Sequence, residues 1–284
     1  MRKIIYTMAL SLMLCATTAY GAPKYSDNVS EFLSELSIMQ GDPDGNMRYD
    51  ALVSRAECTK IAVAASSYRN SVAIGAKTSP FKDVPYTHWS SPYVTVAIKN
   101  GLCTGYLDAT FRPQNTVLYE EAATMFLRVL GYTNEDFGAS WPDGQIGIAK
   151  NIGILDNIDK SVGEALTRRD VATMVYNTLN AKQKGSQSTY LSTFNRSIID
   201  DVVLISTTNE DASIAEGKIF TSSGTYNYDD TLALSNIGMR GSMVLRNNDT
   251  VVAFIPDDRH EFTELFIEHI PVGIEAGCGE LPPG

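Results

Sequence analysis

The feature of this sequence that most constrains its fold is a stretch that occurs twice at a fixed offset. Residues 38–57 read IMQGDPDGNMRYDALVSRAE, and residues 102–121 read LCTGYLDATFRPQNTVLYEE. A gap-free alignment places Gly41 on Gly105, Asp44 on Asp108, Arg48 on Arg112, Val53 on Val117 and Glu57 on Glu121. A third, degraded copy ends in LTRRD at residues 166–170. Repetition at this scale indicates units that bury their apolar faces only by packing on each other, which favours a binding scaffold over an enzyme.

The first 21 residues have the pattern of a secretory signal peptide. Arg2 and Lys3 form a basic start, an apolar run follows over residues 4–18, and Ala19-Tyr20-Gly21 suits cleavage before Ala22. The run is too short and wrongly flanked for a membrane-spanning helix. We therefore expect a secreted protein whose mature chain, from residue 22, has no membrane span.

The mature chain is strongly acidic. Loss of Arg2 and Lys3, with no acid removed, takes the formal charge from −10 to −12. Such a surface repels nucleic acid and anionic lipid, so an anionic ligand must be bound by a few well-placed cations. Three cysteines remain, Cys58, Cys103 and Cys278, and an odd count without a close pair is a weak disulfide framework. We expect Cys58 and Cys103, which stand among small and apolar residues, to be buried free thiols.

The second copy, residues 81–132, is the most complete. Apolar residues at helical spacing over 93–98 predict a helix that ends at Asn100-Gly101, where glycine fits the left-handed position after the last turn. A turn follows at residues 105–108. A longer helix is then predicted over 120–130, with an apolar face made by Ala123, Met125, Phe126, Val129 and Leu130.

The long helices of the other two copies begin with capping boxes. These are Ser54-Arg55-Ala56-Glu57 and Thr167-Arg168-Arg169-Asp170. In such a box the hydroxyl accepts a hydrogen bond from the amide three residues on, and the acid accepts one from the cap's own amide. Each cap stabilises its helix by about 1 kcal/mol. The second copy has Leu118 at the cap and Tyr119 where the others carry arginine, so we expect its helix start to be less well satisfied.

Taken together, these motifs resemble the S-layer homology (SLH) domain. The likeness rests on Phe81-x-Asp83-Val84, on His88-Trp89, on the segment from Gly101 to Pro113 and on the two arginine-containing caps. It extends over residues 22–182, in repeats at about 24–75, 81–132 and 138–182, the third aligned by Trp141 and Gly153. The third copy lacks the Gly-x-x-Asp turn, and the first has Tyr25 where Trp89 would align.

The resemblance implies an all-α, pseudo-threefold unit with three long helices in a central bundle and shorter helices as prongs. It also implies non-covalent binding of a secondary cell-wall polysaccharide, typically pyruvylated, in grooves between neighbouring repeats. By this resemblance the polymer-binding residues are Arg55, Arg168, Trp89, Trp141, Gly101, Gly153 and Asp83. Because Tyr119 replaces the family arginine, we expect at most two competent grooves.

The chemistry of these residues agrees with that role. A guanidinium pairs with a pyruvyl carboxylate bidentately, and a helix N-terminus beside it also favours an anion. The alternatives are structural: Arg55 and Arg168 as solvated first-turn residues, the two tryptophans as core, and Asp83 as a turn or cap residue.

From residue 198 the pattern changes to short alternating runs. Strands are predicted at 202–205, 218–221, 224–228, 241–245 and 250–255, with hairpin turns at 223–224 and 247–249 and a bulge or bend at 238–241. We therefore predict a small antiparallel β-barrel or sandwich over 198–256. A polar linker, 183–197, precedes it, and a tail, 257–284, with a possible short helix at 261–268 follows.

Catalytic and metal-binding patterns are weak. The HExxE sequence at residues 260–264 lacks the second histidine of a zinc protease, and Asp42-x-Asp44-Gly45 departs from a calcium loop. No Gly-x-Ser-x-Gly or phosphate-binding loop is present. We expect no metal and no cofactor.

We therefore predict a non-enzymatic, secreted protein of the bacterial cell surface that is anchored to wall polysaccharide, with other envelope proteins as possible partners. The alternatives are a wall hydrolase with catalysis in the C-terminal region and a purely structural S-layer subunit.

Overall fold

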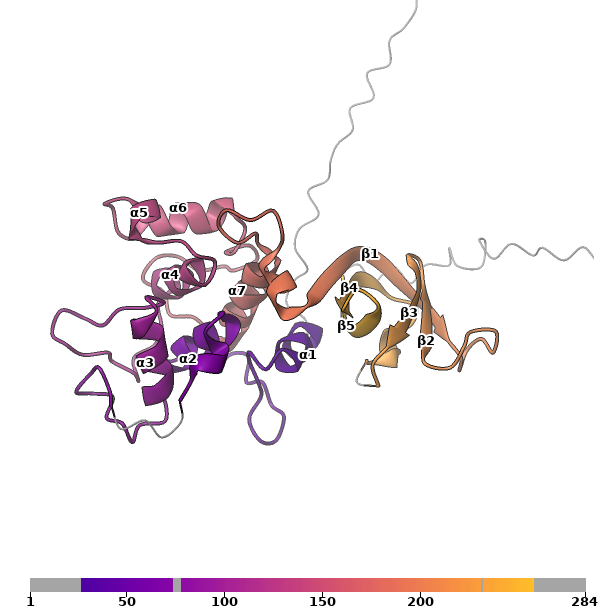
Figure 1. The fold of residues 1–284 in the computed structure, drawn as a ribbon, viewed down its shortest axis with the longest axis horizontal. Helices are drawn as coiled ribbons and strands as arrows, with labels where there is room; N and C mark the ends of the chain where they lie inside the picture. Colours follow the sequence, from indigo (N-terminus) through magenta and orange to yellow (C-terminus); the bar gives the residue numbers. More distant parts are fainter. Residues whose placement is uncertain (1–26, 74–77, 231, 258–284) are drawn as a thin grey trace, which may run out of the picture.

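The computed structural model describes residues 27–73, 78–230 and 232–257 (Figure 1). The signal peptide, the helix predicted at 261–268 and Cys278 lie outside these residues. The described chain combines helices with a five-stranded sheet, so the predicted α plus β composition is confirmed. Helices occupy one side of Figure 1 and strands the other, with α1 between them.

The α-helices are α1 (Asp27–Glu35), α2 (Arg55–Ala65), α3 (Ser91–Lys99), α4 (Tyr119–Val129), α5 (Asn134–Phe137), α6 (Asp143–Asn151) and α7 (Arg168–Asn180). Three short 3-10 helices are η1 (Arg69–Ser71), η2 (Tyr190–Phe194) and η3 (Leu234–Asn236). The strands are β1 (Arg196–Thr207), β2 (Lys218–Thr221), β3 (Gly224–Tyr228), β4 (Arg240–Arg246) and β5 (Thr250–Pro256).

Both predicted capping boxes are present. The Glu57 amide donates to the Ser54 hydroxyl at 3.2 Å, and the Ser54 amide donates to Glu57 Oε2 at 2.8 Å. Thr167 and Asp170 make the same two bonds at 3.2 and 2.8 Å. The sequence therefore fixes where α2 and α7 begin.

The segments that precede α2, α4 and α7 meet in a closed cycle of backbone hydrogen bonds. The Val53 amide donates to the Leu166 carbonyl at 2.9 Å, Leu166 donates to Val117 at 3.1 Å, and Val117 donates back to Val53 at 2.9 Å. A second cycle joins the first residue of each helix to the segment before another: Arg55 to Asn115, Tyr119 to Glu164 and Arg168 to Ala51. The three long helices also contact one another, so their starts lie side by side.

The shorter helices pack outside these three. Helix α3 contacts α2, and α6 contacts α4. Each is followed by a glycine in the left-handed region, Gly101 at φ +70° and Gly153 at φ +80°, as predicted for Gly101.

The strands pair in the order β1-β2-β3-β5-β4, and β4 pairs again with β1, which closes the ring. All these pairs are antiparallel except β3 with β5, which is parallel at Asn227–Thr250 and Tyr228–Val251. The purely antiparallel arrangement predicted from the sequence is therefore wrong. The physical reason is parity: a ring of five strands cannot alternate direction all the way round, so one neighbouring pair must be parallel.

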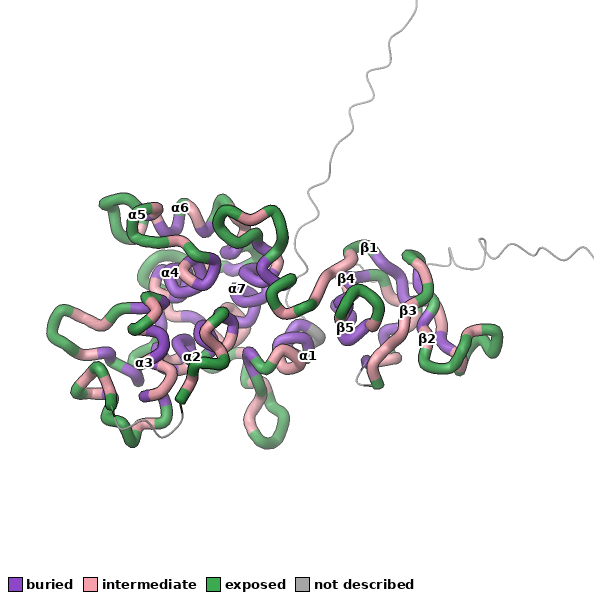
Figure 2. The backbone as a smooth tube through the Cα atoms, in the orientation of Figure 1, coloured by how far each residue is buried: buried purple, intermediate pink, exposed green. Residues whose placement is uncertain are grey.

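One apolar cluster joins the two regions. It contains the buried side chains of the helices together with Val244, Val252, Ala253 and Ile255 of β4 and β5. A second cluster fills the inside of the ring: Val202, Leu204, Ile219, Leu232, Met243, Leu245, Val251 and Phe254. Strands β4 and β5 are thus buried on both faces, as the purple tube in Figure 2 shows.

The segment between the two regions also contributes to this core. Tyr190 and Leu191, within the predicted linker 183–197, are buried in it. Arg196 at the start of β1 makes an ion pair with Glu35 at the end of α1. In the described ranges, no helix has the length and apolar character needed to cross a bilayer.

Candidate functional site: the arginine interfaces between the repeats

Arg55, at the start of α2, reaches into the turn of the second repeat. Its Nε donates to the Phe111 carbonyl at 3.0 Å, its Nη2 donates to the Thr104 carbonyl at 2.6 Å, and its Nη1 lies 3.0 Å from Glu121 Oε1. The guanidinium carbon also lies 4.8 Å from the centre of the Tyr106 ring. Only 6% of the Arg55 side chain is exposed. Each guanidinium nitrogen of Arg55 therefore has a partner inside the protein.

Arg168, at the start of α7, makes the equivalent contacts with the first repeat. Its Nε donates to the Met47 carbonyl at 2.7 Å and its Nη2 donates to the Gln40 carbonyl at 2.9 Å. The offset that aligns the two copies places Met47 on Phe111 and Gln40 on Thr104. The two arginines thus bind equivalent carbonyls of the turn in a neighbouring repeat.

The two interfaces differ in their third contact. The alignment of the copies places Glu57 on Glu121, but Glu57 makes no ion pair with Arg168. Across the described part of the chain, no carboxylate pairs with Arg168. Arg168 is also less buried than Arg55. Its Nη1 accordingly has no protein partner among the residues described.

A tyrosine accounts for part of this difference. The Tyr106 hydroxyl donates to Glu121 Oε1 at 2.7 Å, which holds that carboxylate beside Arg55. Burial and this hydrogen bond raise the pKa of Tyr106, so the hydroxyl keeps its proton. The aligned residue in the first repeat is Asp42, whose Oδ1 accepts from the amides of Asp44 and Asn46 within its own turn.

The third interface has no arginine. Tyr119 takes that position and is buried, and Glu120 Oε2 accepts from the Gly163 amide at 2.9 Å. Leu118 has no side-chain acceptor for the helix, so only the acid half of the box remains, with the Leu118 amide donating to Glu121 Oε2 at 3.2 Å. The less satisfied start predicted for α4 is confirmed.

Asp83 has a structural role in the same turn that Arg55 contacts. It accepts from the Phe111 amide at 2.9 and 3.0 Å and from the Arg112 amide at 2.7 Å. The Phe111 carbonyl accepts from Arg55. Asp83 and Arg55 therefore bind the amide and the carbonyl of the same residue, Phe111. These bonds give Asp83 the turn role that the sequence offers as an alternative.

The two tryptophans are available to a ligand. Trp89 is 48% exposed and Trp141 is 55% exposed, so neither is core. The ring of Trp89 lies 5.7 Å from that of His88 and 6.5 Å from that of Tyr93, forming a small aromatic surface at the start of α3. Trp141 precedes α6. In the described residues, no hydrogen bond or cation–π contact joins either tryptophan to Arg55 or Arg168.

Gly101 and Gly153 act through the backbone. The Gly101 carbonyl accepts from Arg128 Nη1 at 2.5 Å, which fixes the loop after α3 to α4. A Cβ at Gly153 would lie 3.0 Å from Asp156 Oδ2, and its positive φ disfavours other residues. Both glycines shape the loops in which the resemblance places them.

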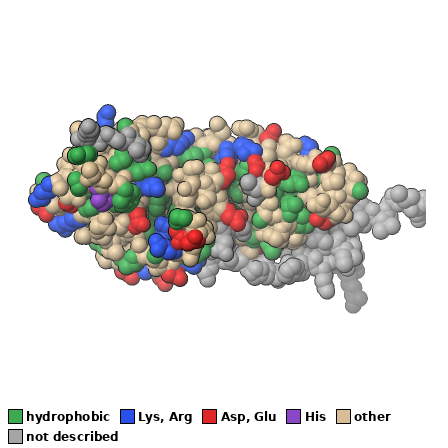
Figure 3. All heavy atoms as spheres, turned by 90° about the horizontal axis from the view of Figure 1, so that it is seen from below, with side chains coloured by type: hydrophobic (Ala, Val, Ile, Leu, Met, Phe, Trp, Pro, Cys, Tyr) green, Lys and Arg blue, Asp and Glu red, His purple; other side chains and the backbone are tan. Residues whose placement is uncertain are grey.

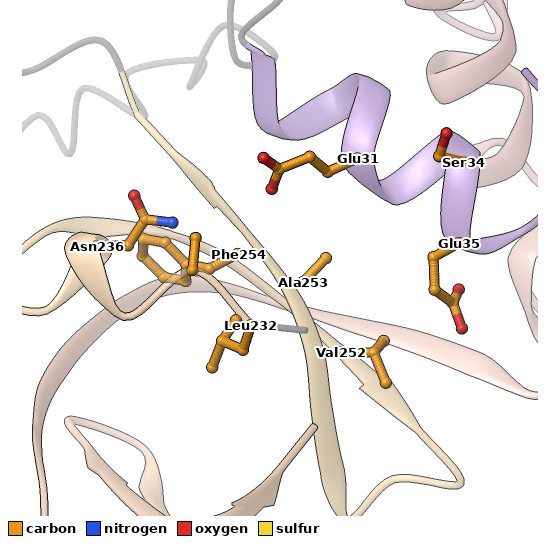
Figure 4. A pocket seen from close by; sticks show the side chains of 9 residues that line it. Glu31, Ser34, Glu35, Leu232, Asn236, Val252, Ala253 and Phe254 are labelled. Atoms are coloured by element: carbon orange, nitrogen blue, oxygen red, sulfur yellow. The ribbon is translucent and has the colours of Figure 1, made fainter. Parts of the chain in front are cut away.

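A cavity of about 300 Å³ lies between α1 and the sheet, and neither Arg55 nor Arg168 lines it. Its lining includes Glu31, Glu35, Asn236, Val252 and Phe254, and Figure 4 shows Glu31 projecting from α1 towards the side of Asn236. None of the predicted site residues lines it. The face in Figure 3 carries basic and acidic side chains interspersed, without one continuous field. Within the ranges described, no three metal-ligating side chains are grouped to hold an ion.

Cys58 and Cys103 are buried free thiols, as predicted. Burial raises the pKa of Cys58 strongly and raises that of Cys103 to about 11 from an ordinary value of 9.0, with the Arg55 charge opposing both shifts. Because the folded pKa exceeds the unfolded one, the stability from this difference is complete below pH 9.0 and is lost as the pH rises through about 11.

We expect both thiols to resist iodoacetamide at about pH 8 in the native protein and to react in urea, since the thiolate is the nucleophile. Peptide mass spectrometry identifies the modified cysteine. A urea midpoint that falls between pH 9 and pH 11 checks the linkage. Rapid native labelling of Cys58 or Cys103 would contradict the burial of these thiols.

Comparison with known families addresses the second repeat directly. Residues 80–123 match the model of the S-layer homology domain. This segment is therefore identified as an S-layer homology domain. The matched segment contains Asp83, Trp89 and Gly101 and ends in α4, so the resemblance seen in the sequence is confirmed.

The similar proteins belong to bacterial surfaces. The chain is 31% identical over 175 residues to the Middle cell wall protein of Brevibacillus brevis, which covers 61% of this chain and 16% of that protein. It is 29% identical over 143 residues to the Surface layer protein of Brevibacillus choshinensis, covering 50% and 13%. It is 27% identical over 101 residues to the Cellulosome-anchoring protein of Acetivibrio thermocellus, covering 35% and 22%.

This chain therefore spans less than a quarter of the length of each of these three relatives. Their names describe wall, surface-layer and anchoring proteins rather than enzymes. The predicted place of the chain at the bacterial cell surface is confirmed by this similarity.

Proposed function

We propose that the chain anchors itself non-covalently to the bacterial cell wall by binding an anionic, pyruvylated secondary cell-wall polysaccharide between its repeats. In this proposal residues 22–182 form one pseudo-threefold unit, supported by the two cycles of backbone hydrogen bonds that join α2, α4 and α7. The observation that carries the proposal is Arg168. Two carbonyls fix its guanidinium at the start of α7, and its Nη1 has no carboxylate partner in the described chain.

The comparison with Arg55 indicates which ligand chemistry suits Arg168. Both arginines donate to equivalent pairs of backbone carbonyls. At Arg55 the remaining nitrogen, Nη1, lies 3.0 Å from the carboxylate of Glu121. A carboxylate placed at Arg168 would make an equivalent charge-assisted hydrogen bond. The dipole of α7, whose N-terminus lies at Arg168, also favours negative charge there. A pyruvyl ketal supplies such a carboxylate on a sugar.

The other predicted residues have two kinds of role in this proposal. Trp89 and Trp141, about half exposed, are placed to stack on sugar rings. Gly101 and Gly153 shape the loops, and Asp83 holds the turn that Arg55 contacts. Arg55 is primarily structural because its guanidinium is already bonded inside the protein.

The decisive experiment is co-sedimentation of the mature protein with purified wall sacculi, before and after extraction of their pyruvylated polysaccharide. We expect Arg168→Met to weaken binding by about 10- to 100-fold, since a hydrogen bond to a charged group contributes about 1.5–3 kcal/mol. Arg240→Met is the control, because it removes an equal charge from a half-exposed position on β4.

The following results of the co-sedimentation would contradict the proposal. Undiminished binding of Arg168→Met would remove Arg168 from the site. Equal binding of the unaltered protein to extracted and unextracted sacculi would show that the polysaccharide is not the ligand, and would favour a purely structural role. Release of soluble wall fragments during the assay would favour the hydrolase alternative.

A further inference from the structure

We infer that Glu121 occupies, beside Arg55, the position that the carboxylate of the ligand takes beside Arg168. The chain then has one open anion site and a second one that it fills with its own side chain. This inference rests on the proposed function, and it specifies which of the repeat interfaces takes the polymer.

The first step is the equivalence of the two arginine settings. Each guanidinium donates through Nε and Nη2 to two carbonyls that the sequence offset aligns, at 2.6–3.0 Å in all four bonds. This shared frame places Nη1 in a corresponding position in both interfaces. Glu121 Oε1 fills that position at Arg55, and the described chain supplies no carboxylate there at Arg168.

The second step is that Tyr106 accounts for the carboxylate beside Arg55 and for its absence beside Arg168. Tyr106 donates its hydroxyl to Glu121 Oε1 at 2.7 Å, and its ring lies 4.8 Å from the guanidinium of Arg55 and 3.9 Å from that of Arg112. Contacts with two cations hold the ring in place, and the ring's hydroxyl in turn holds the carboxylate that it binds. The first repeat has Asp42 at this position, and its negative charge would repel Glu57 rather than hold it.

The third step is the balance of charge. Arg55 and Glu121 are 6% and 14% exposed, so the pair is neutral and largely shielded from solvent. A ligand carboxylate would find no unpaired cation there, and it would have to displace Glu121 to pair with Arg55. At Arg168 no carboxylate of the described residues pairs with the cation, so an entering carboxylate gains the full ion pair. Arg168 is therefore available to a ligand carboxylate, whereas Arg55 is already paired with a carboxylate of the chain itself.

The test is chemical rescue of Glu121→Ala, which opens a carboxylate-sized gap beside Arg55. We expect this variant to unfold at a lower temperature than the unaltered protein in chloride. Acetate at equal ionic strength should restore part of the loss in melting temperature, because it binds the folded state at the vacated position. The matched control is Glu57→Ala, which removes the acid of the equivalent capping box but leaves Arg168 as it was.

The inference predicts a gain in acetate for Glu121→Ala that exceeds the gains of Glu57→Ala and the unaltered protein. If Glu121→Ala is unfolded in chloride, recovery of its helical circular dichroism in acetate is the supporting result. If it is unfolded in both salts, Glu121→Ser opens a similar gap, keeps a hydroxyl for the helix start and decides the question. Equal behaviour of the variants in the two salts would overturn the inference.

This experiment is independent of wall binding. Failure of the rescue removes the role of Glu121 and leaves the Arg168 site to be judged by co-sedimentation. Failure of the co-sedimentation removes the proposed function, while a positive rescue would still show that the pocket beside Arg55 accepts a carboxylate.

Discussion

Replacing Arg55 by methionine should destabilise the protein by about 3–5 kcal/mol, the usual cost of removing one partner of a buried ion pair. The change would leave Glu121 as an uncompensated charge that is 14% exposed, and it would remove the donors to the Phe111 and Thr104 carbonyls. Methionine keeps much of the volume, so the loss reports the charge and the hydrogen bonds rather than a cavity. Urea unfolding followed by circular dichroism measures it.

The matched variant is Arg168→Met, at the equivalent position of another repeat. It also loses two hydrogen bonds to carbonyls but leaves no described carboxylate unpaired, so we expect a loss of about 1–3 kcal/mol. We therefore expect the two variants to differ in which property they change. Arg55→Met should mainly lower the free energy of unfolding, and Arg168→Met should mainly weaken wall binding. Equal losses of stability would contradict the distinction that the structure draws between the two arginines.

The sequence predicted the local structure well where the signal is local. Capping boxes fix the starts of α2 and α7, and alternating apolar runs with polar turns locate all five strands, because hydroxyl caps and strand periodicity act over a few neighbouring residues. The parallel β3–β5 pair was not predictable in this way, since it follows from closure of the whole ring.

The site was only partly predictable for the same reason. The alignment of the copies located Arg55 and Arg168, but it gave no information on which repeat each side chain contacts. The partners Glu121 and Tyr106 follow from the order of the repeats around the cycle of hydrogen bonds. The difference between Tyr106 and Asp42 is visible in the gap-free alignment, yet it acquires meaning only once Arg55 is placed beside that turn.

The junction between helices and sheet could not be foreseen from composition, because the segment before β1 is polar. The strand predicted at residues 250–255 corresponds to β5, which lies at this junction. In the structure Val252 and Ile255 belong to the core of the helices, while Val251 and Phe254 fill the ring. An apolar run without alternation is typical of a strand buried on both faces. That signal was present in the sequence.

Shortening Ile255 to alanine should therefore destabilise the helices as well as the sheet, by about 2–5 kcal/mol. Ile255 is fully buried in the shared cluster, although it lies on β5. The two tryptophans, Trp89 and Trp141, both belong to the helical region, so tryptophan fluorescence reports that region alone. We expect its urea midpoint to fall together with the midpoint from circular dichroism.

Phe220→Ala on β2 is the control, because that side chain is 43% exposed and its removal leaves the shared cluster unchanged. A fluorescence midpoint that stays constant in Ile255→Ala would show that the helices unfold independently of the sheet. A common shift would mean that the β strands stabilise the repeats that hold Arg168. The proposed wall binding would then depend on residues of the sheet as well, since unfolding of that core would also release the Met47 and Gln40 carbonyls from Arg168.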